Sequence, residues 1–531
     1  MNTDTVVTEQ SNSPFPAHSR VVSSGLEIFS DRPLNPDYLG RRIAAEYQRS
    51  LDQKPEIELR QDDTLLDDQV RSLNYDIPVT VLVLGACGSL ASGFLSRGAF
   101  ELGTYLGDSS PVRYIMCDIF EPDSPEVAQL LKRRLADKEY TLHESAPYLS
   151  VSQLTEETCR ELEIALMFAA TPPNIHIADA IRAQELGVQT YIEKPAYPAG
   201  YGAEKRPIIE QALSSGKVGL IDFFLGNRAL IDFLDEPQKF LSGQLIAPNY
   251  SLGEIEYIHA TCLEPHSVNE EGARRKMLMS FEAQGGFLYA DQAPHPLAIM
   301  EATLNSLFRR SLTDSAVAAT YRTRETAVSG PEDAETGGAV LRVLDTSQFA
   351  LVPSRPRIEL LSVVGKGLPV IGGADQVALP NYMLTIGCTE GRLDICVGNG
   401  QNTLPSYLSL TPSDPTFPTR MFEYTHSGLG YSLILADLVI AAQAQRQGVE
   451  VPAETAARLD RHTNASMAAM RSIEEVYQLW NRNSSSLQHY GEGEPMREPK
   501  LPPELPLSCF IHGHIREDES RRVGRDLLKQ S

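Results

Sequence analysis

The sequence predicts an α/β protein with two kinds of sheet: a doubly wound parallel sheet, followed by an α+β domain with a large open, mostly antiparallel sheet. Residues 77–84 (IPVTVLVL) form a short apolar, β-branched run typical of a buried parallel strand. A glycine-rich turn follows, and strand-like and helix-like segments then alternate, which predicts βαβ units. After about residue 215, strand-like segments outnumber helices, which favours antiparallel pairing.

Each element of this prediction has its own sequence signal. In the parallel sheet, we expect strands at 77–84, 112–117, 164–169 and 188–192, and helices at 90–106, 125–136 and 174–186. In the second domain, we expect helices at 228–240, 297–308 and 429–444, and strands at 254–261, 316–322, 339–343, 357–364, 383–388 and 392–397.

The composition excludes several classes of protein. The 531 residues include 47 basic and 70 acidic side chains, and the net charge of −23 argues against nucleic acid or an anionic membrane as the main partner. Seven cysteines are scattered singly, so we expect neither a disulfide framework nor a zinc site. The cluster at 509–514 (CFIHGH) offers three metal ligands and no fourth. We find no secretory leader and no apolar run of membrane length, and therefore expect a soluble cytoplasmic protein.

The first predicted strand ends in a glycine-rich loop, Gly85-Ala86-Cys87-Gly88-Ser89-Leu90. In a Rossmann domain, a strand that runs through glycines into a helix places backbone N–H groups against a pyrophosphate. Gly85 allows the tight turn, and Gly88 allows close approach of the ligand. Cys87 replaces the middle glycine of GxGxxG, so an ordinary tight turn is the alternative.

Asp118 ends the second predicted strand. A carboxylate there can accept hydrogen bonds from both ribose hydroxyls and would repel a 2′-phosphate, which favours NAD over NADP, with NADP still possible. The distance from the glycine loop is longer than usual, and Asp118 could instead cap the following helix.

Two further loops follow buried strands and would face the same crevice. The first contains Ala170, Thr171, Pro172 and His176, and its Asn174 can cap the next helix. The second contains Glu193 and Lys194. A Glu-Lys pair at a strand end can also be a solvated rim.

The glycine loop, residues 171–176 (TPPNIH) and residues 193–195 (EKP) together resemble the Gfo/Idh/MocA oxidoreductases, which are NAD(P)-dependent sugar and cyclitol dehydrogenases. Residues 285–295 (GGFLYADQAPH) are similar to that family's GG-then-DxxxH segment. The resemblance covers roughly residues 77–480. It implies that Lys194, Asp291 and His295 are catalytic, and that the chain forms homodimers or homotetramers through the sheet of its second domain.

A secondary resemblance is to glucose-6-phosphate dehydrogenase. Residues 85–91 are similar to its glycine loop, residues 222–227 (DFFLGN) to its DHYLGK segment, and Gly365-Lys366 to a later GK pair. Phe223 and Asn227 replace the histidine and lysine that contact substrate in that segment, which argues against glucose 6-phosphate. Arg228 and Lys366 are weak candidates for substrate contacts, and a surface salt bridge is the alternative for Arg228.

Oxidation of a secondary alcohol requires a base and a group that steadies the developing alkoxide. His295 suits the base, Asp291 can orient its imidazole, and Lys194 can donate to the reacting oxygen. In the alternative interpretation, Asp291 is only the N-cap of a helix beginning near Pro294, and His295 is a surface residue of its first turn.

These signals divide the chain into an extension at 1–75 with one predicted helix at 36–52, a dinucleotide-binding Rossmann domain at 76–200, an α+β substrate and oligomerisation domain at 201–481, and a Pro- and charge-rich tail at 482–531. The predicted function is hydride transfer between a nicotinamide and a sugar, sugar phosphate or cyclitol. A non-catalytic dinucleotide sensor, or a scaffold that binds no cofactor, are the alternatives.

Overall fold

The computed structural model describes residues 56–60, 70, 72–88, 91, 112–136, 141–198, 201–264, 292–327, 340–351, 358–366, 381–397, 406–424 and 430–482. They fall into two compact units. We call the part within Asp62–Asn227 and Gly430–Met470 the parallel-sheet unit, and the part within Met1–Gln61, Arg228–Leu429 and Arg471–Ser531 the large-sheet unit. The predicted helices at 36–52 and 90–106 lie outside the described residues, apart from Ala91.

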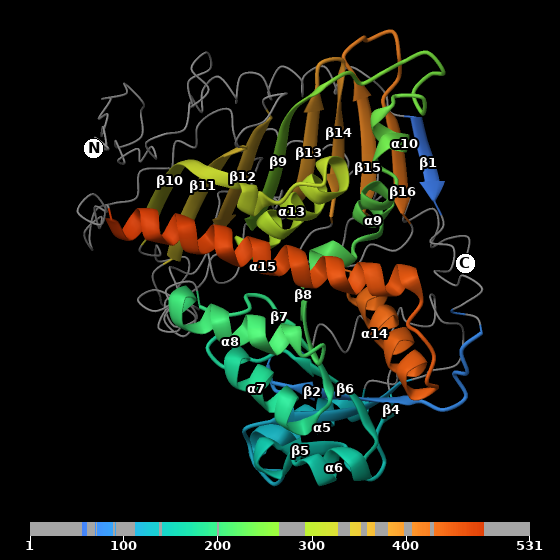
Figure 1. Cartoon of the computed structure of the whole chain (residues 1–531), viewed down its shortest axis with the longest axis vertical. Coiled ribbons are helices and arrows are strands. Elements are labelled where there is room, and N and C mark those ends of the chain that lie inside the picture. The colour runs from blue at the N-terminus through green and yellow to red at the C-terminus, as the bar shows by residue number, and fades with distance from the viewer. Residues whose placement is uncertain are drawn as a thin grey trace. The chain divides into compact units, whose positions relative to one another are not determined.

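The parallel-sheet unit contains a seven-stranded parallel sheet in the order β4-β3-β2-β6-β7-β8, with β5 paired to β3 (Figure 1). Its strands are β2 (Val79–Leu84), β3 (Val112–Asp118), β4 (Thr141–Leu142), β5 (Tyr148–Ser150), β6 (Ile164–Ala169), β7 (Gln189–Glu193) and β8 (Val218–Ile221). All six residues of β2 are buried, as its β-branched run predicts for a central parallel strand. The predicted doubly wound sheet is therefore confirmed.

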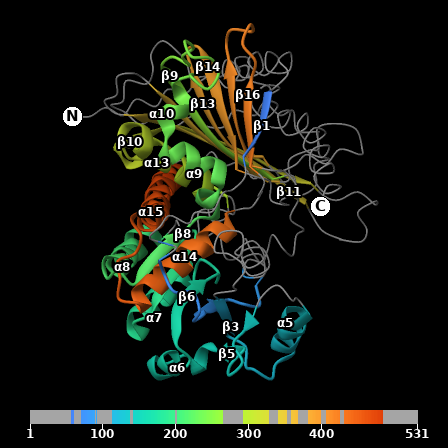
Figure 2. The same ribbon diagram turned by 90° about the vertical axis from the view of Figure 1, so that its right-hand side faces the viewer.

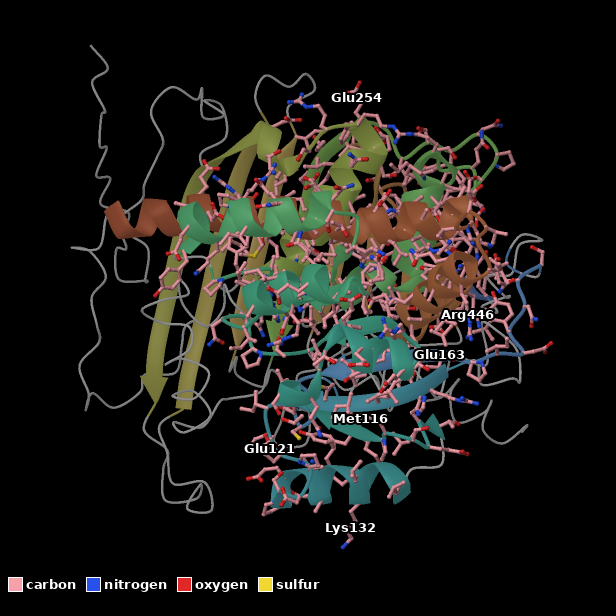
Figure 3. All side chains as sticks on the ribbon, turned by 60° about the horizontal axis from the view of Figure 1, so that its bottom comes forward. Met116, Glu121, Lys132, Glu163, Glu254 and Arg446 are labelled. Carbon is pink, nitrogen blue, oxygen red and sulfur yellow. The ribbon has the colours of Figure 1, made fainter. Side chains whose placement is uncertain are left out.

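The helices of this unit are α5 (Pro125–Ala136), α6 (Glu156–Glu161), α7 (His176–Leu186), α8 (Gly202–Ser214), α14 (Tyr431–Arg446) and the first part of α15 (Ala453–Arg482). Asn174 does not cap α7, because the helix starts two residues later and Ile175 takes the N-cap position. Figure 3 shows Lys132 on the outer side of α5, and it shows Arg446 of α14 beside Glu163, whose carboxylate lies 3.5 Å from the guanidinium.

The parallel-sheet unit differs from the predicted domain of residues 76–200. β8 lies beyond residue 200 and pairs with β7 in parallel. α15 is bonded to this strand and its end: Thr463 Oγ1 accepts the backbone N–H of Leu220 at 3.1 Å, and His462 Nδ1 accepts that of Asp222 at 3.3 Å. The parallel-sheet unit is therefore built from two separate segments of the chain, residues 62–227 and 430–470, whereas the predicted domain was one continuous segment.

The large-sheet unit contains a nine-stranded sheet in the order β1-β16-β15-β14-β13-β9-β12-β11-β10. Neighbouring strands are antiparallel except for β1 with β16 and β12 with β9. The strands are β1 (Glu56–Arg60), β9 (Ile255–Glu264), β10 (Ser315–Ala327), β11 (Val340–Leu351), β12 (Glu359–Lys366), β13 (Asn381–Cys388), β14 (Gly391–Cys396), β15 (Tyr407–Pro412) and β16 (Arg420–Tyr424). The mostly antiparallel sheet was predicted, whereas β1, β15 and β16 were not.

Helices α9 (Arg228–Asp235), α10 (Pro237–Leu241) and α13 (Pro294–Phe308) cover one face of this sheet (Figures 1 and 2). The Tyr424 hydroxyl donates to Asp232 of α9 at 2.8 Å, so the side chain of Tyr424 points to the helix-covered face. By register, that face carries Ile258, Leu384 and Leu408, which are all buried. The opposite face is more polar and holds the Arg392–Asp394 ion pair.

The predicted helix at 228–240 is two helices. Glu236, with φ of −130° and ψ of 57°, separates α9 from α10. Pro237 explains the break, because proline disfavours the helical conformation of the residue before it. Among the described residues, no helix is long and apolar enough to cross a membrane.

Candidate functional site

Four predicted cofactor segments lie at the carboxyl ends of four adjacent strands, β3, β2, β6 and β7. Gly85 follows β2, Asp118 ends β3, Ala170 follows β6, and Glu193 ends β7. Because all four strands are parallel, these ends meet at one edge of the sheet, where open α/β sheets bind ligands.

Gly85 brings together the glycine loop after β2 and the Thr171 loop after β6. It has a φ of +74°, and a Cβ atom built on it would lie 2.8 Å from the carbonyl oxygen of Ala170 and 3.0 Å from the nitrogen of Thr171. Both the left-handed backbone and the close approach require glycine. The Ala170 N–H also donates to the Leu84 carbonyl at 3.0 Å. The glycine loop and the Thr171 loop therefore form one packed unit.

The backbone N–H groups at the start of the glycine loop are already bonded within the protein. Ala86 donates to the Cys117 carbonyl at 3.1 Å, and Gly88 donates to the Gly85 carbonyl at 2.9 Å. Cys87 donates to Asp118 Oδ2 at 2.9 Å. These bonds build the turn. Ser89 and Leu90, the last two predicted loop residues, lie outside the described residues.

The glycine loop positions Asp118, the residue predicted to bind the adenosine ribose beside it. Its Oδ2 accepts the Cys87 N–H, and its Oδ1 accepts the N–H of Ile119 at 2.8 Å. The Cys87 thiol also bonds to this carboxylate, and because each carboxylate oxygen has two lone pairs, the carboxylate retains the capacity to accept a further hydrogen bond. Burial, followed by the charge of Asp118, raises the pKa of the Cys87 thiol to about 11. Cys87 is therefore a neutral thiol at physiological pH.

His176 links the Thr171 loop to the loop that follows β7. Its imidazole is completely buried, with Nδ1 2.7 Å from the carbonyl oxygen of Pro195 and Nε2 2.8 Å from that of Thr171. A neutral imidazole has one N–H and can donate to only one of these oxygens, and a second proton would allow it to donate to both. His176 thus holds the Thr171 loop to the Lys194-Pro195 loop, where the peptide bond is cis.

Asp179, one turn further along α7, completes this link and was missed in the sequence. The Thr171 hydroxyl donates to Asp179 Oδ2, and Arg182 lies 3.2 Å from its Oδ1. Burial raises the pKa of Asp179 and lowers that of His176. The spacing of three residues after His176 on a predicted helix could have indicated that the two side chains share a face.

Glu193 and Lys194 are not a solvated rim. Both residues are at most 9% exposed, and Lys194 Nζ lies 3.6 Å from Glu193 Oε1. The Lys194 N–H also donates to the Ile221 carbonyl of β8 at 3.2 Å. The two side chains therefore form a buried ion pair at the carboxyl end of β7.

The remaining predicted residues belong to the large-sheet unit. His295 lies in the first turn of α13 and is 7% exposed, so the alternative of a surface histidine is wrong. Asp291 lies outside the described residues, and Ala293 takes the N-cap position of α13. Arg228 Nε binds Asp232 at 3.0 Å, as the salt-bridge alternative predicted. Lys366 ends β12, where its backbone pairs with Glu264.

Comparison with known proteins identifies a shared fold. No family model matches the sequence, and neither does any curated protein. An inositol dehydrogenase homolog from Azotobacter vinelandii, crystallised with NAD+, matches with a TM-score of 0.50 at 15% identity, over 77% of this chain and 96% of that chain. At this identity the likeness shows the fold alone.

Two other structures match with lower scores. Biliverdin reductase from Synechocystis sp. PCC 6803, with biliverdin and NADP+, has a TM-score of 0.45 at 15% identity, over 76% of this chain and 99% of that chain. A 3-ketoreductase from Actinomadura kijaniata, with NADP and TDP-benzene, has a TM-score of 0.45 at 14% identity, over 75% and 96%. The secondary resemblance to glucose-6-phosphate dehydrogenase finds no support in these matches and stays a prediction.

Proposed function

We propose that this protein is an oxidoreductase that transfers a hydride between NAD and a secondary alcohol of a sugar, sugar phosphate or cyclitol, with NADP as the second-choice cofactor. The observation that carries the proposal is the joining of four separate motif segments at one edge of the parallel sheet. Gly85 packs on the Thr171 loop, Cys87 binds Asp118, and His176 connects Thr171 to Pro195. An ordinary tight turn after β2 would not need these connections.

The residues present fit a bound dinucleotide. Since the N–H groups of Ala86, Cys87 and Gly88 are used to build the turn, the pyrophosphate would be held by the next two N–H groups, those of Ser89 and Leu90. Asp118 would bind the adenosine ribose with its remaining lone pairs. Ala170, Thr171 and Pro172 would line the crevice. His176 would hold the Thr171 loop in place through the Thr171 carbonyl, and Glu193 would pair with Lys194.

When bound, the nicotinamide supplies the acceptor or donor of the hydride. The protein must then take the proton of the substrate hydroxyl and stabilise the developing negative charge on its oxygen. We assign the proton to His295, with Asp291 orienting its imidazole, and we assign the oxygen to the Lys194 ammonium. The resemblance to Gfo/Idh/MocA oxidoreductases at residues 193–195 and 285–295 supports these three roles.

The test is to add NAD or NADP to the purified full chain with a panel of sugars, sugar phosphates and cyclitols, and to follow the absorbance of the reduced cofactor. Replacement of the base should slow the chemical step more than it weakens cofactor binding. His295→Ala should lower kcat about a hundredfold to ten-thousandfold while the Kd for NAD stays nearly constant. Asn305→Ala, an exposed position on the same helix, is the matched control.

Two results would contradict the proposal in different ways. Binding of NAD without turnover on any substrate would favour a dinucleotide sensor on the same fold. No binding of NAD or NADP at all would remove the cofactor assignment, and with it the function.

A further inference from the structure

Gln292 lies two residues before the start of α13. Its backbone carbonyl accepts the N–H of His295 at 3.1 Å, which closes the turn leading into the helix. Gln292 is therefore three residues from the proposed base, in the same short segment. Its side chain lies inside the protein, since only 1% of the residue is exposed.

The amide of Gln292 has no hydrogen-bond partner. Neither Oε1 nor Nε2 is bonded to any residue within the described part of the chain. A buried amide in this state bears the full penalty of lost hydration, and proteins seldom leave such groups unsatisfied. An amide of this kind, three residues before a proposed catalytic residue and joined to it by a backbone hydrogen bond, indicates a group that binds a ligand.

Other buried polar side chains of α13 show that this helix normally satisfies its polar atoms. Glu301 accepts the hydroxyl of Ser311 at 3.0 Å and the backbone N–H of Leu312. The hydroxyl of Thr303 donates to the carbonyl of Ile299 at 2.7 Å. Gln292 differs from both, which argues for an external partner.

The chemistry of the amide restricts what that partner can be. A primary amide presents an acceptor oxygen and a donor NH₂ group side by side. A hydroxyl both donates and accepts, so one or two neighbouring hydroxyls satisfy both amide atoms. An ionised carboxylate or a phosphate offers acceptors, and would leave Oε1 facing negative oxygens.

We infer that Gln292 binds hydroxyl groups of the substrate next to the reacting carbon, and thereby selects neutral polyols over substrates that carry an anionic group at that position. The inference rests on the proposed function and deepens it. In this inference Gln292 determines substrate specificity, and His295 keeps its proposed role as the base.

The test compares Gln292→Met with wild type. Methionine keeps the approximate shape of glutamine and removes both polar atoms. With myo-inositol and D-glucose as the neutral probes, and with a phosphate monoester and a deoxy analogue of each, we expect the KM of Gln292→Met for the neutral probes to rise about tenfold to a hundredfold. The kcat should change little, because a hydroxyl that does not react is bound equally in the ground and transition states.

Two controls separate binding from folding. Thr303→Val removes a satisfied hydroxyl from the same helix, so it should lower stability without changing KM. Gln292→Met removes no protein partner, so its midpoint of urea unfolding should be unchanged or higher. Wild type should discriminate against the deoxy analogue that lacks the contacted hydroxyl, and Gln292→Met should lose that discrimination.

The outcomes distinguish this inference from the proposed function. If wild type binds NAD and oxidises the neutral probes but Gln292→Met has the same KM and the same discrimination, Gln292 does not contact substrate. If wild type is active only on the phosphorylated probes, selection of neutral polyols is wrong. Binding of NAD without oxidation of any probe contradicts the proposed function, on which the inference rests. Absence of NAD binding contradicts the proposed function itself.

Discussion

Substitution of Gly85 by alanine tests whether the glycine loop and the Thr171 loop must touch. An alanine at a φ of +74° carries a conformational cost of about 1–2 kcal/mol, of which about 0.4–1 kcal/mol is offset because alanine restricts the unfolded chain. The new Cβ would also lie 2.8 Å from the Ala170 carbonyl oxygen, a backbone atom that cannot rotate away. Overpacking of this kind costs about 1–3 kcal/mol.

The two contributions can be separated with Gly187, which lies in the same unit. It has a φ of +67°, but a Cβ there would meet nothing within 4 Å. Gly187→Ala should therefore show the conformational cost alone, a net loss of about 1 kcal/mol. Gly85→Ala should lower the free energy of unfolding by about 2–4 kcal/mol.

The assay is urea unfolding of both variants, together with calorimetric titration of NAD. Displacement of the Thr171 loop should weaken NAD binding by Gly85→Ala at least about tenfold, and binding by Gly187→Ala should match wild type. Equal stabilities of the two variants, or unchanged NAD affinity of Gly85→Ala, would refute the reasoning that these loops form one packed unit.

Three further predictions concern titration and cofactor choice. Burial lowers the pKa of His462 to about 4, below its ordinary 6.5, so the unfolded chain binds the proton more tightly than the folded chain does. The free energy of unfolding should therefore fall by about 3 kcal/mol as the pH drops from 6.5 to 4. Urea unfolding of His462→Gln should lack this contribution. Cys87, with its pKa of about 11, should be alkylated slowly at pH 8 and faster in Asp118→Asn, as mass spectrometry of the labelled peptide would show; equal rates would contradict the influence of Asp118. Asp118→Asn should also reduce the preference for NAD over NADP in calorimetric titration, and an unchanged ratio would remove Asp118 from the ribose role.

Prediction from the sequence succeeded where the signal is local. The apolar run before Gly85 marks a buried strand, because such residues alone suit a strand covered on both faces. The helix at 125–136 was predicted with its bounds, because its apolar and charged positions have helical spacing. The break before Pro237 could also have been predicted from the proline, but the prediction of one helix at 228–240 did not take it into account.

The candidate site was predicted as a set of separate motifs. The residue types and their positions at strand ends were enough to name Gly85, Asp118, Thr171, His176 and Lys194. Their neighbours in space could not be named, because hydrogen bonds such as that between His176 and Pro195 join residues 19 positions apart, and no local pattern encodes their pairing.

The class of fold and the residues worth testing could be predicted from the amino-acid sequence, because hydrophobic periodicity and glycine turns act over a few residues. The folded structure was needed to show that β8 extends the parallel sheet, that β1 pairs with β16 across more than 350 residues, and that His462 of α15 bonds to the end of β8. It also decided that Gly85 must be glycine and that the amide of Gln292 is buried without a partner among the described residues. These features depend on which atoms meet after the chain has folded, and distant segments meet through packing that short stretches of sequence do not specify.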